Sequence, residues 1–335
     1  MDYVIAEQWW AQPDSNRRHP PCKGGALPTE LWARRQATDW SCRLHLMGQE
    51  RAGNLPNMPT VAQVQAAVQG RYPVELAADW DAVGLVCGDP TAQVDLALLA
   101  VDPDPKVIDE GIALGAQMLI VHHPLLLRPV HGVAATDEKG RTIHRLITSG
   151  IALLTAHTNA DHADPGVSDA LAEALGLTEL RPLDPLAPGS HEGTGRVGVL
   201  PEALTLTEFA SLVAERLPDT AHGVRVARGV DCADLSVCTV RTVAVCGGAG
   251  DSLLGLTGDV DVYVTADLRH HRAGEHLADG GCALVDVAHW ASEWPWLTQL
   301  QAFLATDLPD LRTVVSTVRT DPWDAWLPSS SEEQS

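Results

Sequence analysis

Basic residues are scarce through most of this chain. The sequence has 335 residues and a formal net charge of −21. Residues 1–57 are almost neutral, with 7 Lys and Arg against 6 Asp and Glu, so residues 58–335 hold 16 basic and 38 acidic side chains. Such an acidic surface repels a phosphate backbone, which excludes non-specific nucleic-acid binding but not a small anion held by a local cation or metal.

Three further signals are missing. The seven cysteines form no Cys-x-x-Cys motif, and an odd number without a paired framework predicts reduced thiols in the cytoplasm. No uninterrupted apolar run reaches the roughly 18 residues that a membrane helix needs, and no basic-then-apolar signal opens the chain, so we expect no membrane association. No Gly-x-x-x-x-Gly-Lys loop is present to cradle a triphosphate.

Residues 1–57 differ from the rest of the chain. They hold four of the ten tryptophans and show no sustained helical or strand period. Their peptides "DSN" and "ALPTEL" are what the complements of the T arm and the D arm of a transfer-RNA gene would encode, in antisense order. We expect a non-native extension, or else a disordered natural one, and a natural start at Met58. N-terminal sequencing of protein from the native locus separates the two.

From Met58 onward, strand and helix patterns alternate. Thr60 and Gln63 form a capping box for an opening helix within 58–73. The continuous apolar strands and the alternation predict an α/β fold with buried, largely parallel sheets. Strands are expected at 94–102, 117–123, 151–159, 240–248, 260–267, 282–290 and 312–319. Further helices are expected at 105–116, 137–150, 166–177, 205–217, 270–281 and 291–305.

The simplest organisation is two α/β halves with a connector. A Pro/Gly-rich stretch follows the helix at 166–177, and the regular alternation resumes near 240. The expected parts are a first half at 58–177, a connector with small α/β elements at 178–240, a second half at 241–320 and a polar tail at 321–335.

Metal-capable side chains follow four of the expected strands. In open α/β sheets, ligands bind in the crevice beyond the carboxyl ends of the strands. Pro124 favours extended geometry at His123, and the spacing of His289 and Glu293 places both on one face of a helix. The candidates are His122 and His123; His157, Asn159 and Asp161; Asp267, His270 and His271; and His289 and Glu293.

Three histidines and two carboxylates exceed one four-coordinate site, and two metals sharing a bridging carboxylate would use them all. Nitrogen and oxygen ligands without thiolate favour zinc, manganese, iron or cobalt. Structural interpretations stay open at this point. A histidine at a strand end can simply be hydrogen-bonded, the His–Glu spacing can be a surface pair, and Asp161 can be a helix N-cap or a turn residue.

Six segments carry a resemblance to a known family. They are "DWDAVGLVCGD" (79–89), "LIVHHPLL" (119–126), "AHTNADHADPGVSDALAEALGL" (156–177), "VAVCGGAGDSLL" (243–254), "DVYVTADLRHHRAGEHLADG" (261–280) and "ALVDVAHWASEWP" (283–295). By these segments, which occur in the family's order and cover nearly all of 58–300, the chain resembles the GTP cyclohydrolase I type 2 homologue family. These dinuclear-metal proteins are also called NIF-three-like.

The resemblance implies two interlocked α/β halves, a dinuclear metal centre in the cleft between them, and ring-shaped homo-hexamers. His157 matches a family histidine near the metals and is expected to orient a ligand or move protons as the catalytic group. Asp267, His270 and His271 match a family motif but are expected outside the metal coordination. The implied ligands of two divalent ions are His122, His123, Asp161, His289 and Glu293, with Glu293 as the bridge and the two adjacent histidines on different metals.

The family name implies that metal-activated water attacks the imidazole ring of GTP, giving dihydroneopterin triphosphate and formate. We therefore expect a metal-dependent hydrolase acting on GTP or another nucleotide-like small molecule. A non-catalytic, ring-forming metal-binding protein and a metal-dependent phosphoesterase are the alternatives. A triphosphate needs cations, yet the nearest basic residues by sequence are Arg128, Lys139, Arg141 and Arg269. The "CGGAGD" segment (246–251) is either an anion site at a helix start or a tight turn.

The chain departs from the family pattern in two places. Ala82 and Ser168 stand where the family commonly has Asn, and the first change removes an amide donor near the pocket. The 178–240 stretch is too short for the extra domain that some relatives carry between the halves. The sequence therefore predicts the short form of the family.

Overall fold

The computed structural model describes residues 58–230 and 232–327, which belong to one unit of the chain. The interpretation of residues 1–57 and the end of the predicted tail lie outside this range. Among the described residues, no helix is both long enough and apolar enough to span a bilayer.

The helices are α2 (Val61–Arg71), α3 (Pro105–Leu114), α4 (Glu138–Thr148), α5 (Thr158–His162), α6 (Val167–Ala174), α7 (Leu206–Arg216), α8 (His270–Ala278) and α9 (His289–Asp307), with 3-10 turns η1 (Val74–Leu76) and η2 (Asp251–Leu256).

Two mixed sheets organise the described chain. The first has the order β1-β4-β3-β2-β11, with β1 antiparallel at one edge and the other strands parallel. The second has the order β5-β6-β8-β9-β10-β7, in which β8, β9 and β10 are parallel. The predicted fold class, α/β with largely parallel mixed sheets, is confirmed. The strands are β1 (Gly84–Cys87), β2 (Leu96–Ala100), β3 (Met118–Val121), β4 (Ala152–Thr155), β5 (Thr178–Pro185), β6 (Gly193–Thr205), β7 (Arg225–Ala227), β8 (Thr239–Ala249), β9 (Val262–Ala266), β10 (Ala283–Val287) and β11 (Arg312–Val315).

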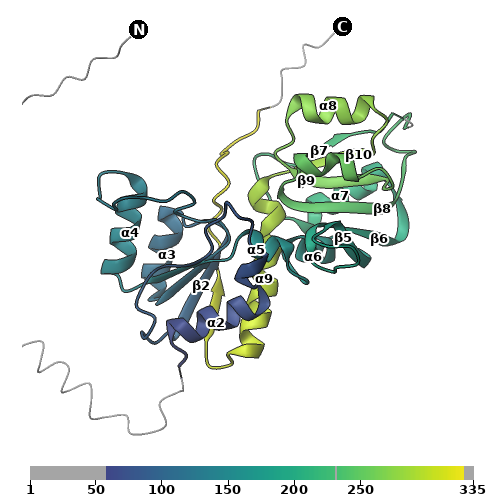
Figure 1. Ribbon diagram of the computed structural model, residues 1–335. Coiled ribbons are helices and arrows are strands. Elements are labelled where there is room, and N and C mark those ends of the chain that lie inside the picture. The colour runs from purple at the N-terminus through teal and green to yellow at the C-terminus, as the bar shows by residue number, and fades with distance from the viewer. Residues whose placement is uncertain (1–57, 231, 328–335) are drawn as a thin grey trace, which may run out of the picture. The chain divides into compact units, whose positions relative to one another are not determined.

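The chain interlocks the two sheets through α9 and β11. Helix α9 follows β10 of the second sheet, and β11 then pairs in parallel with β2 of the first. Figure 1 shows α9 and β11 in yellow among the purple and blue elements of the first sheet. Strands β5, β6 and β7, from the predicted connector, belong to the second sheet, and β11 belongs to the first. The domain boundaries themselves stay a prediction.

Successive side chains of the central strands point to opposite faces of each sheet and contribute to three buried apolar clusters. In β2, Ala97 and Leu99 face a large core that also contains α9, α6 and the second sheet, whereas Leu96 and Leu98 face a core with α3 and α4. In the second sheet, the opposite face packs against η2 and α8. Because both faces of each central strand are covered, apolar residues do not alternate with polar ones along it, which is typical of parallel sheets.

Several predicted boundaries hold, but three predicted strands run too far. The strand predicted at 312–319 ends at Val315, where its pairing with β2 ends. The capping box of Thr60 and Gln63 opens α2. The strand predicted at 282–290 ends at Val287, because its last pairing is Val287 with Ala266, and α9 already begins at His289. The strand predicted at 151–159 ends at Thr155, where its pairing with β3 ends, and 158–162 is helical.

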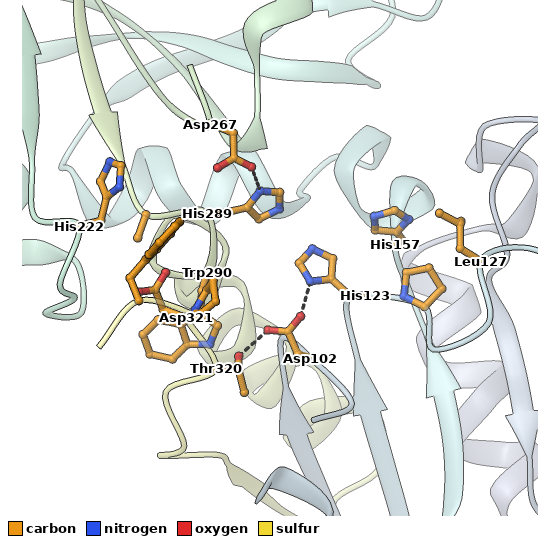
Figure 2. Close-up of a pocket in the computed structure, with 14 residues that line it drawn as sticks. Asp102, His123, Leu127, His157, His222, Asp267, His289, Trp290, Thr320 and Asp321 are labelled. Atoms are coloured by element: carbon orange, nitrogen blue, oxygen red, sulfur yellow. Dashed lines mark hydrogen bonds and ion pairs between the residues drawn. The ribbon is translucent and has the colours of Figure 1, made fainter. Parts of the chain in front are cut away.

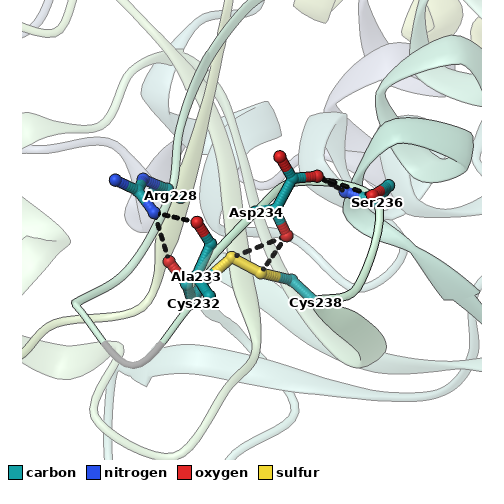
Figure 3. Close-up of a disulfide and its surroundings, with 6 residues drawn as sticks. All are labelled: Arg228, Cys232, Ala233, Asp234, Ser236 and Cys238. Carbon is teal, nitrogen blue, oxygen red and sulfur yellow. Dashed lines mark hydrogen bonds between the residues drawn. A yellow bond between two sulfur atoms is a disulfide. The ribbon is translucent and has the colours of Figure 1, made fainter.

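Two cysteines contradict the expectation of reduced thiols. Cys232 and Cys238 form a disulfide whose Cα atoms are 5.5 Å apart, which is within the usual range. Figure 3 shows this disulfide in the loop before β8, where Arg228 donates hydrogen bonds to the carbonyl oxygens of Cys232 and Ala233. Sequence reasoning missed this pair because the two cysteines lie six residues apart and form no Cys-x-x-Cys motif. Cys87, Cys246 and Cys282 are free thiols among the described residues.

Candidate metal centre

His122 and His123 lie just beyond β3, where regular strand pairing stops. His122 is fully buried, and its Nδ1 is 2.9 Å from the carbonyl oxygen of Ala156. His123 Nδ1 is 2.7 Å from Asp102 Oδ1. The two rings are 5.1 Å apart, because the chain has left the pleated geometry that would send neighbouring side chains to opposite faces. Each ring keeps Nε2 free to face the same space.

His289 and Glu293 occupy the first turns of α9 and share one helix face. His289 Nε2 is 2.9 Å from Glu293 Oε1, and His289 Nδ1 is 2.7 Å from Asp267 Oδ2. The irregular end of β8 passes close by at Gly248, which has φ +68° and lies where the register with β9 shifts. A Cβ there would lie 2.5 Å from Glu293 Oε1 and 3.0 Å from His289 Nε2. The "CGGAGD" segment is therefore the end of β8 and the start of η2 rather than a tight turn, and its Gly248 makes room for this pair.

Glu293 lies at the centre of the cluster. Its Oε2 is 3.1 Å from His123 Nε2, and its Oε1 is 3.5 Å from His122 Nε2. Together with His289, three imidazole nitrogens surround one carboxylate that is only 3% exposed. Two of these histidines come from the first sheet, while the third comes from the helix that follows the second. The structure thus brings together segments that are far apart in the sequence.

His157 and Asp161 come from the short helix after β4. His157 Nδ1 is 2.8 Å from Asp81 Oδ1. The ligand atoms of His122, His123 and His157 lie within 4.8 Å of one another, as do those of His123, His289 and Glu293, so His123 is common to both groups. Asp161 Oδ1 is 3.7 Å from His122 Nε2, at the edge of the cluster and outside both groups.

The remaining predicted candidates lie elsewhere. His270 and His271 begin α8 on an exposed surface and belong to neither group found among the described residues. Asn159 is buried and donates from Nδ2 to the carbonyl oxygen of Tyr72 at 2.7 Å, which is a structural role. Arg269, one of the basic residues considered for a phosphate, is paired with Asp251.

A cavity of about 520 Å³ opens onto the cluster. His123, His157 and His289 line it, together with Asp102 and Asp267, as Figure 2 shows. The residues at the other side include the segment 320–323, which follows β11. Residues 321–323, predicted to begin a polar tail, therefore form part of the pocket wall.

The sequence profile of the Duf34/NIF3 (NGG1p interacting factor 3) family matches residues 59–322. The chain belongs to this family. The predicted resemblance is therefore confirmed. A GTP cyclohydrolase 1 type 2 homolog of Streptomyces coelicolor is 49% identical over 281 residues, a match that covers 82% of this chain and 96% of the relative.

Two more relatives of this Duf34/NIF3 protein bear on its form. A GTP cyclohydrolase 1 type 2 homolog of Mycobacterium tuberculosis is 37% identical over 374 residues, covering 79% of this chain and 96% of the relative. That alignment is longer than the present chain, so the relative carries insertions that the short form lacks. The crystal structure of a Bacillus cereus protein related to NIF3 has a TM-score of 0.70 and 25% identity, covering 80% of this chain and 99% of that one.

The charges of the Duf34/NIF3 cluster are strongly coupled. Burial would raise the pKa of Glu293, but His123, His289 and His122 outweigh it and hold that pKa well below its usual range. Burial opposes protonation of His289, yet the carboxylates of Glu293 and Asp267 raise its pKa to about 10. At His157, burial and the neighbouring His122 lower the pKa. The Glu293 carboxylate is thus surrounded by three imidazoles, and a bound cation would contact the carboxylate and the imidazole nitrogens together.

The residues present fit a metal. His122 Nε2 and Glu293 Oε2 are buried and make no hydrogen bond among the described residues, although His123 Nε2 lies 3.1 Å from that oxygen. Leaving such atoms unsatisfied is costly unless a ligand binds them. All nearby donor atoms are imidazole nitrogens or carboxylate oxygens, and Cys246, whose buried thiol has its pKa raised to about 12, lies outside both groups. This donor set suits divalent ions of the zinc, manganese, iron and cobalt type.

Three carboxylate–histidine pairs orient the cluster. Each of Asp102, Asp267 and Asp81 lies within 2.8 Å of the Nδ1 of one histidine, which leaves Nε2 facing inward. Sequence reasoning missed Asp102 and Asp81 as partners. Asp102 carried the same signal as the histidines, because it follows a strand of the same sheet.

Removing the charge of one orienting carboxylate should weaken metal binding. We expect Asp267→Asn to lower zinc affinity about 10–100-fold, since the amide cannot stabilise the bound imidazole as the carboxylate does. Asn is the suitable substitution because Asp267 has φ +57°, which Asn tolerates. Competition with a chromogenic chelator measures the affinity. The exposed Asp259→Asn serves as control, and equal affinities of the two variants would contradict the orienting role.

Proposed function

We propose that this Duf34/NIF3 protein is a metal-dependent hydrolase with a dinuclear centre that acts on a nucleotide-like small molecule. GTP is the substrate that the relatives' name suggests. The observation that carries the proposal is the position of the Glu293 carboxylate among the Nε2 atoms of three histidines. The proposed ligands of two divalent ions are His122, His123, Asp161, His289 and Glu293.

The chain's own residues support hydrolysis in distinct ways. The chemistry that divalent metals supply in such a site is activation of water near neutral pH and polarisation of a substrate oxygen. Glu293 faces histidines from both groups and is suited to bridge. Asp81 fixes Nδ1 of His157, and the lowered pKa of His157 favours a neutral ring that accepts a proton through Nε2. His157 is therefore the proposed catalytic residue.

Turnover tests the proposal directly. The full chain, loaded in turn with zinc, manganese or iron, is incubated with GTP and a panel of phosphoesters. We expect formate and pterin fluorescence that fall at least about 100-fold in His157→Ala, the range of general acid–base catalysis. His144→Ala, an exposed histidine on α4, should keep full activity.

Each other outcome favours a named alternative. Phosphate release without formate would support a metal-dependent phosphoesterase that uses the same cluster. A fully metal-occupied protein with no turnover on any substrate would support a non-catalytic, ring-forming role and overturn the hydrolase proposal. The homo-hexamer and the cytoplasmic location stay predictions, and sedimentation of the full chain measures the first.

A further inference from the structure

Hydrogen bonds hold the segment after β11 beside the histidines and Glu293 of the candidate metal centre. The hydroxyl of Thr320 donates to Asp102 Oδ2, while Asp102 Oδ1 contacts His123. Farther back, Ser316 N donates to the carbonyl oxygen of Leu99 at 2.8 Å and holds the segment beside β2. Figure 2 shows the chain Thr320–Asp102–His123 as a continuous set of contacts at the pocket. The residues that follow Thr320 are thus held at the pocket.

An open aromatic face lies on this segment. Trp323 lines the pocket, yet 63% of its surface is exposed, so the indole is available to a ligand. Pro322 and the largely buried Trp290 line the same wall. The family match ends at residue 322, so Trp323 is a feature of this chain outside the matched part. Planar rings stack well on an exposed indole.

An unpaired carboxylate adjoins that face. Asp321 lines the pocket, and its Oδ2 is buried without a hydrogen-bond partner among the described residues. Asp102 and Asp267 have histidine partners, so their carboxylates are already engaged. Figure 2 shows Asp321 and Trp290 on one side of His289 and His123, with His157 and Leu127 on the other. A ligand that donates N–H groups to Asp321 would remove the cost of this unpaired oxygen.

The lining offers no side-chain cation to a polyphosphate. None of the 14 residues that line the pocket is Lys or Arg, whereas three are aspartates. Arg225, the basic residue nearest along the chain to the lining residue His222, is paired with Asp286. A triphosphate would therefore depend on the proposed metals, or on Arg128 and Arg319, which adjoin the lining residues Leu127 and Thr320.

The geometry points to a substrate class and to the residues that select it: a planar, nucleobase-like heterocycle that stacks on Trp323 and donates N–H groups to Asp321. This inference rests on the proposed function, because it places that ring beside the metal cluster. Trp323 and Asp321 then determine specificity, while the cluster performs the chemistry.

Equilibrium dialysis of the zinc-loaded full chain tests the inference by binding, without requiring turnover. Guanosine and GTP are the probes, since they share a base and differ in the triphosphate. We expect both to show saturable binding, because they present the same base to Trp323 and Asp321. Trp323→Ala should weaken guanosine about 10-fold or more, the usual loss on removing a stacking partner. Asp321→Asn should weaken it by a similar factor.

Two matched variants serve as controls. Trp326→Ala and Asp324→Asn change exposed residues of the same segment that do not line the pocket, and they should leave guanosine affinity unchanged. Elemental analysis should show wild-type zinc content in all four variants. An absence of saturable guanosine binding, or equal affinities of Trp323→Ala and Trp326→Ala, would each overturn the inference. Guanosine binding without any turnover would overturn the hydrolase proposal alone.

Discussion

Glu293→Gln is expected to reduce the metal content of the protein from about two ions per chain to less than one. The substitution keeps the size of the side chain but removes the negative charge that three imidazole Nε2 atoms face at 2.9, 3.1 and 3.5 Å. Both candidate groups border this carboxylate, so both should lose affinity. Elemental analysis of chains equilibrated with a small excess of zinc, manganese or iron measures the content.

Single histidine variants distinguish the two positions. His122→Ala removes the proposed ligand that lies nearest to Asp161, so about one metal per chain should remain. His123→Ala should remove more, because His123 belongs to both groups. This differs from the expectation that each adjacent histidine serves its own metal. Glu275→Gln on α8 is the control with unchanged content, and a wild-type content below about one ion per chain would falsify the dinuclear assignment.

Asp169→Ala is expected to lower the free energy of unfolding by about 3–5 kcal/mol, because it leaves a buried guanidinium without its counter-charge. Arg196 is 1% exposed and Asp169 is 4% exposed. Arg196 Nε is 2.7 Å from Asp169 Oδ1, and Arg196 Nη2 is 2.7 Å from Asp169 Oδ2. The same carboxylate accepts from the backbone N–H of Gly166 at 2.7 Å, at the start of α6.

The pair also bears on the candidate site. Arg196 Nη2 donates to the carbonyl oxygen of Ala163 at 2.6 Å, and Ala163 directly follows the helix that carries Asp161. Urea denaturation of the full chain measures the stability change. The double variant Asp169→Ala/Arg196→Met should lose less than the single one, because it leaves no buried charge unpaired.

An exposed ion pair provides the contrast. Arg71 and Asp307 form a bidentate contact at the surface, so Asp307→Asn should change stability far less than Asp169→Ala. Similar losses in the two variants would mean that burial of Arg196 is not the cause. A loss below about 1 kcal/mol in Asp169→Ala would contradict the buried-pair argument outright.

Local pattern was sufficient for the elements and for the position of most candidate residues. Apolar runs predicted the central strands because both of their faces are buried, and four-residue spacing placed His289 and Glu293 on one helix face. The ends of the helices and strands were predicted less accurately. No local sequence signal marked Val287 as the end of β10, because that end depends on where β9 stops pairing.

The sequence by itself determined the alternation of strands and helices, the family, and the histidines and carboxylates that follow the strands. Only the tertiary structure decided their partners: Asp81 for His157, Asp102 for His123, and the close approach of Gly248 to Glu293. It also returned β11 to the first sheet and thereby brought Trp323 to the pocket. The physical reason is separation along the chain, because hydrogen bonds and packing between distant residues depend on how whole elements dock rather than on any local period.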